Sequence, residues 1–243
     1  MPDVLIVETR GPVRILTLNR PHKLNALDTP LTRALCEALD DAAGNPDVRA
    51  LVLAGAGRGF CAGADTAEFA DLVPGQGDLV ADRAALTARL HRLLREVPQP
   101  IVSAIHGAAV GGGAGLAIGC DMAVAAEGTR FGYPELRHDL VPALVMTNLV
   151  RQMGRKLAFE LVATGRMLSA TEMLAAGLVN RVVPEGSALD AAIALAETCA
   201  RPKLVAMQAT KRLFHEVAEA DFDAAMEAGL QANIAMRGYR EAE

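Results

Sequence analysis

The sequence predicts an α/β fold in which strands and helices alternate, followed by a mainly helical C-terminal third. Twice, a short aliphatic run leads into a glycine-rich turn and then into a helical pattern. Strands that alternate with helices imply crossover connections of the βαβ kind rather than an all-helical bundle. Beyond Pro142 the strand signal nearly disappears, leaving 179–183 as the one clear β-branched run.

The N-terminal part begins with two strand-like runs, at 4–9 and 13–19. The turn residues Arg10-Gly11-Pro12 separate them, so we predict an antiparallel hairpin. Apolar residues then recur on one face of a predicted helix over 29–44.

Two glycine-rich units follow the hairpin and this helix. A buried strand at 50–54 precedes the loop at 55–63, and a strand at 101–105 precedes the turn at 107–113. The other elements expected in this part are a helix-like segment after residue 63, a flexible stretch around 74–77, a helix at 79–97, a small-residue helix ending at 119 and a strand at 121–125. The helices expected in the last third lie near 143–153, 155–163, 170–176, 187–199, 203–217 and 221–236.

Composition narrows the class of protein. With 243 residues, 51% of them hydrophobic, the chain is long enough for one domain with a sizeable core. A net charge of -5 gives no sign of nucleic-acid or membrane binding, and the apolar stretches end before the roughly 20 residues that a membrane helix requires. Four scattered cysteines and no secretory signal pattern lead us to expect a cytoplasmic protein.

The two glycine-rich turns are candidates for binding an oxyanion. A helix start leaves its first N–H groups without intrahelical partners, so each turn can aim one backbone donor at a ligand oxygen. One donor from each turn would stabilise a thioester oxygen that becomes negative when the adjacent carbon loses a proton. The alternative is that Gly111, Gly112 and Gly113 only permit close packing. Phosphate binding by these turns is a weaker hypothesis, because neither of them contains GxxxxGK[ST] or GxGxxG.

Short motifs recur along the chain and resemble a known set. They are Leu18-Asn19-Arg20-Pro21, Leu24-Asn25-Ala26-Leu27, Arg58-Gly59-Phe60-Cys61-Ala62-Gly63-Ala64-Asp65, Gly111-Gly112-Gly113 ahead of Cys120-Asp121, Phe131-Gly132-Tyr133-Pro134-Glu135, Thr164-Gly165-Arg166, Ser169-Ala170, Gly177-Leu178-Val179 and Val182-Val183-Pro184. In order and spacing they resemble the successive motifs of the enoyl-CoA hydratase/isomerase (crotonase) family, over essentially the whole chain.

This resemblance implies a crotonase-like spiral of ββα and βαβ units over 1–185, which holds an acyl-CoA site. It implies a helical C-terminal trimerisation region over 186–243, and hence a homotrimer or a dimer of trimers. The implied activity is on acyl-coenzyme A thioesters of the kind found in fatty acid metabolism. Coenzyme A enters as part of the substrate, and no separate cofactor or metal is implied.

The resemblance also assigns site residues. It makes the backbone N–H groups of Ala64 and Gly112 the oxyanion hole. Family positions for the adenine and pantetheine parts of coenzyme A fall on Lys23, Leu24, Ala62 and Asp65. Most of these contacts use backbone groups in the family, and Lys23 is the one candidate for a phosphate.

Of the two glutamates that family hydratases carry, this chain has only one: Gly115 stands at the first position and Glu135 at the second. Adding water across a conjugated double bond needs a base and an acid, usually two carboxyl groups. Moving a double bond from the 3,4 to the 2,3 position needs one group that takes a proton from C2 and returns it at C4. With Glu135 as catalytic group, the sequence slightly favours isomerisation (Δ3 to Δ2), with hydration of 2-enoyl-CoA close behind.

Residues near Glu135 leave other readings open. The aspartate that dienoyl isomerisation and dehalogenation use, eight positions later, is Ala143 here. His138 and Asp139 are candidates for the acyl pocket, although such residues more often cap a turn or face solvent. The segment at 140–143 resembles one in methylglutaconyl-CoA hydratases that also carry glycine at the first glutamate position, which keeps hydration open. The missing carboxylate also fits a non-catalytic acyl-CoA-binding protein or a thioester decarboxylase.

Overall fold

The computed structural model describes residues 3–70 and 77–240. The main sheet has the order β1-β2-β3-β4-β6-β9 within these ranges. Its strands are β1 (Leu5–Arg10), β2 (Val13–Leu18), β3 (Ala50–Gly55), β4 (Ile101–Ile105), β6 (Met122–Ala126) and β9 (Arg181–Val183). β1 and β2 pair antiparallel and the later neighbours pair parallel, so the predicted hairpin and crossovers are confirmed. Of the stretch expected to be flexible, 74–77, residues 74–76 lie outside the described residues.

Helices connect and cover these strands. Their bounds are α1 (Thr29–Gly44), α2 (Gly77–Glu96), α3 (Gly112–Gly119), α4 (Met146–Gln152), α5 (Arg155–Thr164), α6 (Ala170–Ala175), α7 (Ala188–Ala200), α8 (Leu204–Val217) and α9 (Phe222–Ala235). Short 3-10 turns lie at η1 (Pro21–Lys23), η2 (Thr66–Ala70), η3 (Glu135–His138) and η4 (Met236–Arg240). Among the described residues, none of the helices is both long and apolar enough to cross a lipid bilayer.

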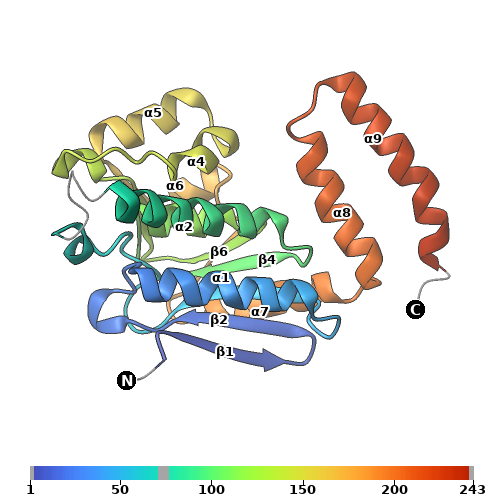
Figure 1. Cartoon of the computed structure of the whole chain (residues 1–243), viewed down its shortest axis with the longest axis horizontal. Coiled ribbons are helices and arrows are strands. Elements are labelled where there is room, and N and C mark those ends of the chain that lie inside the picture. Colours follow the sequence, from blue (N-terminus) through green and yellow to red (C-terminus); the bar gives the residue numbers. More distant parts are fainter. Residues whose placement is uncertain (1–2, 71–76, 241–243) are drawn as a thin grey trace.

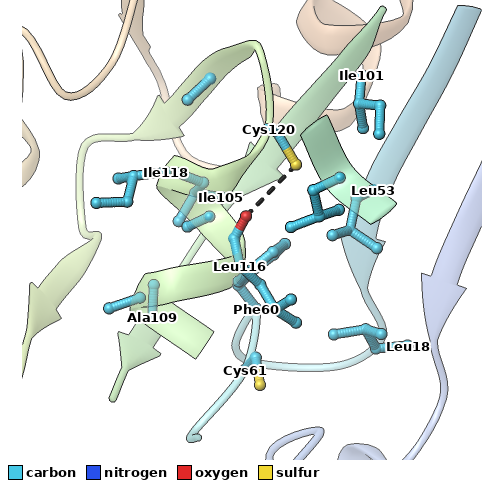
Figure 2. Packing of buried hydrophobic residues seen from close by; sticks show 14 of the residues in the cluster. Leu18, Leu53, Phe60, Cys61, Ile101, Ile105, Ala109, Leu116, Ile118 and Cys120 are labelled. Atoms are coloured by element: carbon cyan, nitrogen blue, oxygen red, sulfur yellow. Dashed lines mark hydrogen bonds between the residues drawn. The ribbon is translucent and has the colours of Figure 1, made fainter. Parts of the chain in front are cut away.

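The central strands are buried on both faces, which explains their continuous apolar runs. Val52 and its alternate neighbours pack against α7, while Leu51 and Leu53 point into the larger cluster under α1, α2 and α3. Figure 1 shows α1 and α2 running side by side across the sheet. In the larger cluster, Phe60 from the first glycine-rich turn and Leu116 from α3 meet the side chains of the strands (Figure 2).

A second, three-stranded sheet differs from the sequence-based expectation. β5 (Ala108–Val110) pairs parallel with β7 (Arg130–Gly132), which pairs antiparallel with β8 (Met167–Ser169). We expected only a turn at 107–113 and no strand at the other two positions. Three residues are too few to display a strand period, so local sequence gives no signal there.

The last two helices, α8 and α9, pack against each other beside the α/β body (Figure 1). Lys211 is the one residue of α8 that is buried, and α9 has none. The Lys211 ammonium lies 2.8 Å from Asp121 Oδ2 and donates to the carbonyl oxygens of Leu94 and Gln99, at 3.1 and 3.0 Å. This buried cation therefore ties the helical hairpin to the body.

Candidate active site

Neighbouring parallel strands bring the two glycine-rich turns together. One turn follows β3 and the other follows β4, and these strands pair, so both turns emerge at the same edge of the main sheet. The Cys61 N–H donates to Ala108 O at 2.9 Å, and the Val110 N–H donates to Cys61 O at 3.0 Å. The backbones of the two turns therefore run in direct contact, with the side chains of Cys61 and Ala109 held near the packed core (Figure 2).

Glycine at 111 and 113 is required by this contact. Gly111 has φ +54°, a left-handed conformation that L side chains rarely adopt. A methyl group added to Gly113 would lie 2.2 Å from Cys61 O and 2.7 Å from its carbonyl carbon. The packing interpretation of the triple glycine therefore holds, and the same close approach brings backbone amides to the site.

Replacing Gly113 by alanine should destabilise the fold. The added methyl meets backbone atoms, which cannot move without separating the two turns, so we expect a loss of about 3 kcal/mol. Gly229→Ala is the matched control, because Gly229 also lies in a helix but has open space around it; a gain of about 0.5 kcal/mol is expected there. Urea unfolding measures both values. Equal stability of the two variants would contradict the close approach.

The Ala64 and Gly112 amides, predicted to form the oxyanion hole, lie close together. A methyl group added to Gly112 would lie 3.6 Å from Ala64 N, and one added to Gly63 would lie 3.3 Å from Gly112 N. Gly112 is the first residue of α3, so its N–H has no partner within the helix. The Leu27 N–H donates to Gly63 O at 2.7 Å, and the Asp65 N–H donates to Leu27 O at 3.1 Å. In this parallel bridge the N–H of the intervening Ala64 points away from Leu27.

A cavity of about 530 Å³ opens in front of these amides. Ala64 and Gly112 line it, together with largely apolar walls from α2 and from residues 140–145. The volume falls within the range of about 300–1,000 Å³ that small-molecule pockets occupy. The structure therefore provides an apolar chamber whose lining includes the two residues that carry the predicted backbone donors.

Glu135 lies at the wall of the same cavity. It begins the short turn η3, and its Oε1 is so close to the backbone of Gly111 that a methyl group there would lie 2.8 Å away. Its Oε2 is inaccessible and accepts no hydrogen bond from a described residue. Burial therefore raises the pKa of the Glu135 carboxyl, as a proton-transferring group requires.

The position of the absent first glutamate, Gly115, is also next to this cavity. Gly115 lies one turn after Gly111, and its N–H donates to Gly111 O at 2.9 Å. A methyl group on Gly115 would lie 2.9 Å from His91 Cε1 and 3.0 Å from Val145 Cβ. His91 and Val145 therefore fill the space beside position 115. Sequence reasoning missed His91; the available signal was a titratable residue adjoining the buried apolar face of α2, which includes Leu90 and Leu94.

Polar contacts fix the loop that carries Ala64. Asn25, fully buried, donates from its side-chain amide to the carbonyl oxygens of Ala56, Gly59 and Phe60, at 2.9, 2.8 and 3.1 Å. Asp65 accepts from Arg20 at 2.8 Å, and this guanidinium holds the pKa of the Asp65 carboxyl below its usual range. The Asp65 side chain is thus paired with Arg20, and the role of Asp65 in coenzyme A binding stays a prediction.

The other predicted coenzyme A positions cluster beside this loop. Lys23 ends η1 and is exposed, and the Ala62 N–H donates to Leu24 O at 2.9 Å. Ala62 also lines the cavity, while Lys23 and Leu24 do not. Of the two acyl-pocket candidates, His138 lines the cavity. Asp139 is exposed, follows the last residue of η3 and has a left-handed backbone conformation. The structure thus brings Ala62 and His138 to the cavity, and Asp139 lies outside its lining.

The described residues at the site include neither an activated cysteine nor a metal-binding cluster. The Cys61 thiol donates to Asn25 O at 3.1 Å, and burial raises its pKa to about 12, so it is a protonated thiol at neutral pH rather than a nucleophile. Among the described residues, no three His, Cys, Asp or Glu side chains are grouped closely enough to hold a metal ion.

Fold and cavity together define an α/β protein with an apolar ligand chamber, two backbone N–H groups without a hydrogen-bond partner among the described residues, and the desolvated carboxyl of Glu135. A sequence model of the family described as enoyl-CoA hydratase/isomerase matches residues 8–239. A putative enoyl-CoA hydratase of Thermus thermophilus is 43% identical over 205 residues, which cover 84% of this chain and 81% of that protein. The 2,3-dehydroadipyl-CoA hydratase of Escherichia coli is 36% identical over 227 residues, with 93% and 86% covered.

Solved structures agree with the sequence comparison. An enoyl-CoA hydratase of Mycobacterium smegmatis has a TM-score of 0.91 and 32% identity, with 97% of this chain and 91% of that chain covered. A putative enoyl-CoA hydratase/isomerase (crotonase) of Legionella pneumophila has a TM-score of 0.89 and 29% identity, with 98% and 92% covered. The chain belongs to the enoyl-CoA hydratase/isomerase family, has the crotonase fold, and is an enzyme that acts on acyl-CoA.

Proposed function

We propose that the thioester oxygen of the acyl-CoA lies between the amides of Ala64 and Gly112, and that Glu135 exchanges protons with the acyl chain. The observation that supports this most is that two N–H groups, unpaired within the described residues, and the desolvated carboxyl of Glu135 line one cavity. The amides stabilise the enolate oxygen as the negative charge develops there, and the cavity walls exclude water that would weaken this interaction.

Hydration of a 2-enoyl-CoA is the reaction we put first. The two sequence relatives described above carry hydratase names, and titratable side chains besides Glu135 line the cavity, among them His91. Isomerisation, which the sequence slightly favoured, is the second candidate. It needs only one proton-transferring group, and Glu135 is the one catalytic glutamate of the family that this chain retains. In either reaction, Glu135 faces C2 and the two amides hold the charge on the thioester oxygen.

The remaining parts of the proposal follow from position and surface. Coenzyme A runs past Lys23, Leu24, Ala62 and Asp65, and the reaction needs no further cofactor. The hairpin of α8 and α9 exposes Phe214, Phe222, Met226, Leu230 and Ile234. Such an apolar surface fits assembly through residues 186–243 into a homotrimer or a dimer of trimers. The cytoplasm is the compartment that we propose for the protein.

The test uses the purified protein with a trans-2-enoyl-CoA and, separately, with a 3-enoyl-CoA. We expect loss of the conjugated chromophore of the first substrate, with a 3-hydroxyacyl-CoA as product. If only the 3-enoyl-CoA reacts, and its product is the conjugated 2-enoyl-CoA, the protein is an isomerase instead. Binding without turnover of enoyl, dienoyl and malonyl-type thioesters would identify a non-catalytic binding protein, and loss of carbon dioxide from the malonyl type a decarboxylase.

A further inference from the structure

His91 occupies the space beside α3 where a side chain at position 115 would point. The Cε1 atom of its ring would lie 2.9 Å from a methyl group on Gly115, and its Nδ1 4.0 Å from one on Gly119. Glu135 lies in the same way against Gly111. Gly111 and Gly115 are one helical turn apart, about 5.4 Å along the axis, so the carboxyl and the imidazole flank one face of α3.

His91 is half-buried, and the shielded part of its side chain includes both ring nitrogens. Both ring nitrogens are inaccessible, and neither has a hydrogen-bond partner among the described residues, although the ring lines the cavity. A buried polar atom without a partner destabilises the fold, and such atoms are rare enough in native proteins that each calls for an explanation, a catalytic role among them. A neutral imidazole has one donor and one acceptor nitrogen, so a rotation of the ring that opens one nitrogen to the cavity lets it bind and deprotonate a water molecule.

We infer that His91 is the second acid–base group of this site and takes the place of the carboxyl that Gly115 lacks. This inference rests on the proposed hydration. With the thioester oxygen at Gly112 and C2 beside Glu135, the acyl chain continues along α3 towards His91. The imidazole therefore lies on the side of C3, the carbon that water attacks.

The proton balance is complete with these two groups. A neutral ring nitrogen of His91 takes one proton from water, and the water oxygen forms the bond to C3. The C2–C3 π electrons move into the enolate held by Ala64 and Gly112, and protonated Glu135 gives its proton to C2. The imidazolium then returns a proton to the Glu135 carboxylate through solvent. Burial lowers the pKa of His91 to about 4, so the ring is neutral at pH 7 and has a basicity like that of a carboxylate.

Two assays separate this role from packing: hydration of trans-2-butenoyl-CoA, and deuterium uptake at C2 of butanoyl-CoA in D₂O, which needs Glu135 and the two amides but no attacking water. For His91→Leu, we expect hydration to fall about 100-fold relative to exchange. Leu94→Ala is the packing control, since Leu94 lies on the same helix and meets α3 at Gly119; it should leave the ratio of the two rates unchanged.

A double variant tests the shared space. His91→Ala with Gly115→Glu should recover at least about tenfold in hydration over His91→Ala alone, because a carboxyl then enters the space that the imidazole left. Equal losses of hydration and exchange in His91→Leu, undiminished hydration, or no gain in the double variant would overturn the role of His91. Absence of both hydration and exchange in the wild type would instead overturn the proposed function.

Discussion

Glu135→Gln should lower kcat by about 10²–10⁴-fold for whichever reaction the enzyme performs, hydration or isomerisation. The amide keeps the size of the carboxyl but cannot transfer a proton, so the KM for the thioester should change little. Glu127→Gln is the matched control, because Glu127 is exposed in the turn before β7. Undiminished turnover in the Glu135 variant would contradict the assignment.

The same substitution should stabilise the folded protein at neutral pH. Because burial raises the pKa of Glu135, the folded state binds this proton more tightly than the unfolded state. The wild type therefore loses stability as pH rises from the ordinary pKa of glutamate, about 4.3, through the raised value, whereas the glutamine variant does not. The difference in Tm, variant minus wild type, should grow from about pH 4 to pH 7. A difference independent of pH would show that the carboxyl is not desolvated.

Lys211→Met should destabilise the fold by about 3 kcal/mol, because removing one partner of a buried ion pair leaves the other uncompensated. The loss stays near the lower end of the usual range, since Asp121 keeps hydrogen bonds to the Ile101 N–H and to His215, at 2.8 and 3.0 Å. Two carbonyl oxygens, of Leu94 and Gln99, also lose their donor.

The measurement for Lys211 is urea unfolding, with Lys156→Met as control. Lys156 is exposed on α5, so its replacement should stay within about 0.5 kcal/mol of the wild type. Because Lys211 is the buried residue of α8, its variant should also show faster amide exchange in α8 and α9 than in the main sheet. Uniform exchange with unchanged stability would contradict its role as the tie between hairpin and body.

The elements that the sequence predicts well are those with long or doubly buried apolar patterns. Leu51, Val52 and Leu53 form a continuous apolar run because both faces of their strand are covered. β5, β7 and β8 are too short to show a period, and they form through pairing with residues distant in the chain. Their sheet is a tertiary property that local sequence does not encode.

The site residues that could be predicted are those that belong to a recognisable sequence motif. Ala64, Gly112 and Glu135 come from the resemblance, since a lone glutamate gives no local sign of burial. His91 and Lys211 were missed because histidine and lysine in amphipathic helices usually contact solvent. Only the packing of α2 against α3, and of α8 against the body, reveals that their polar atoms are buried.

The central claim, that an enolate oxygen is held by the amides of Ala64 and Gly112 beside Glu135, is tested most directly by a crystal structure with butanoyl-CoA, which the enzyme cannot hydrate. We expect the thioester oxygen about 3 Å from both amide nitrogens, and a Glu135 oxygen beside C2. A thioester oxygen that contacts neither amide, or an acyl chain outside this cavity, would contradict the claim.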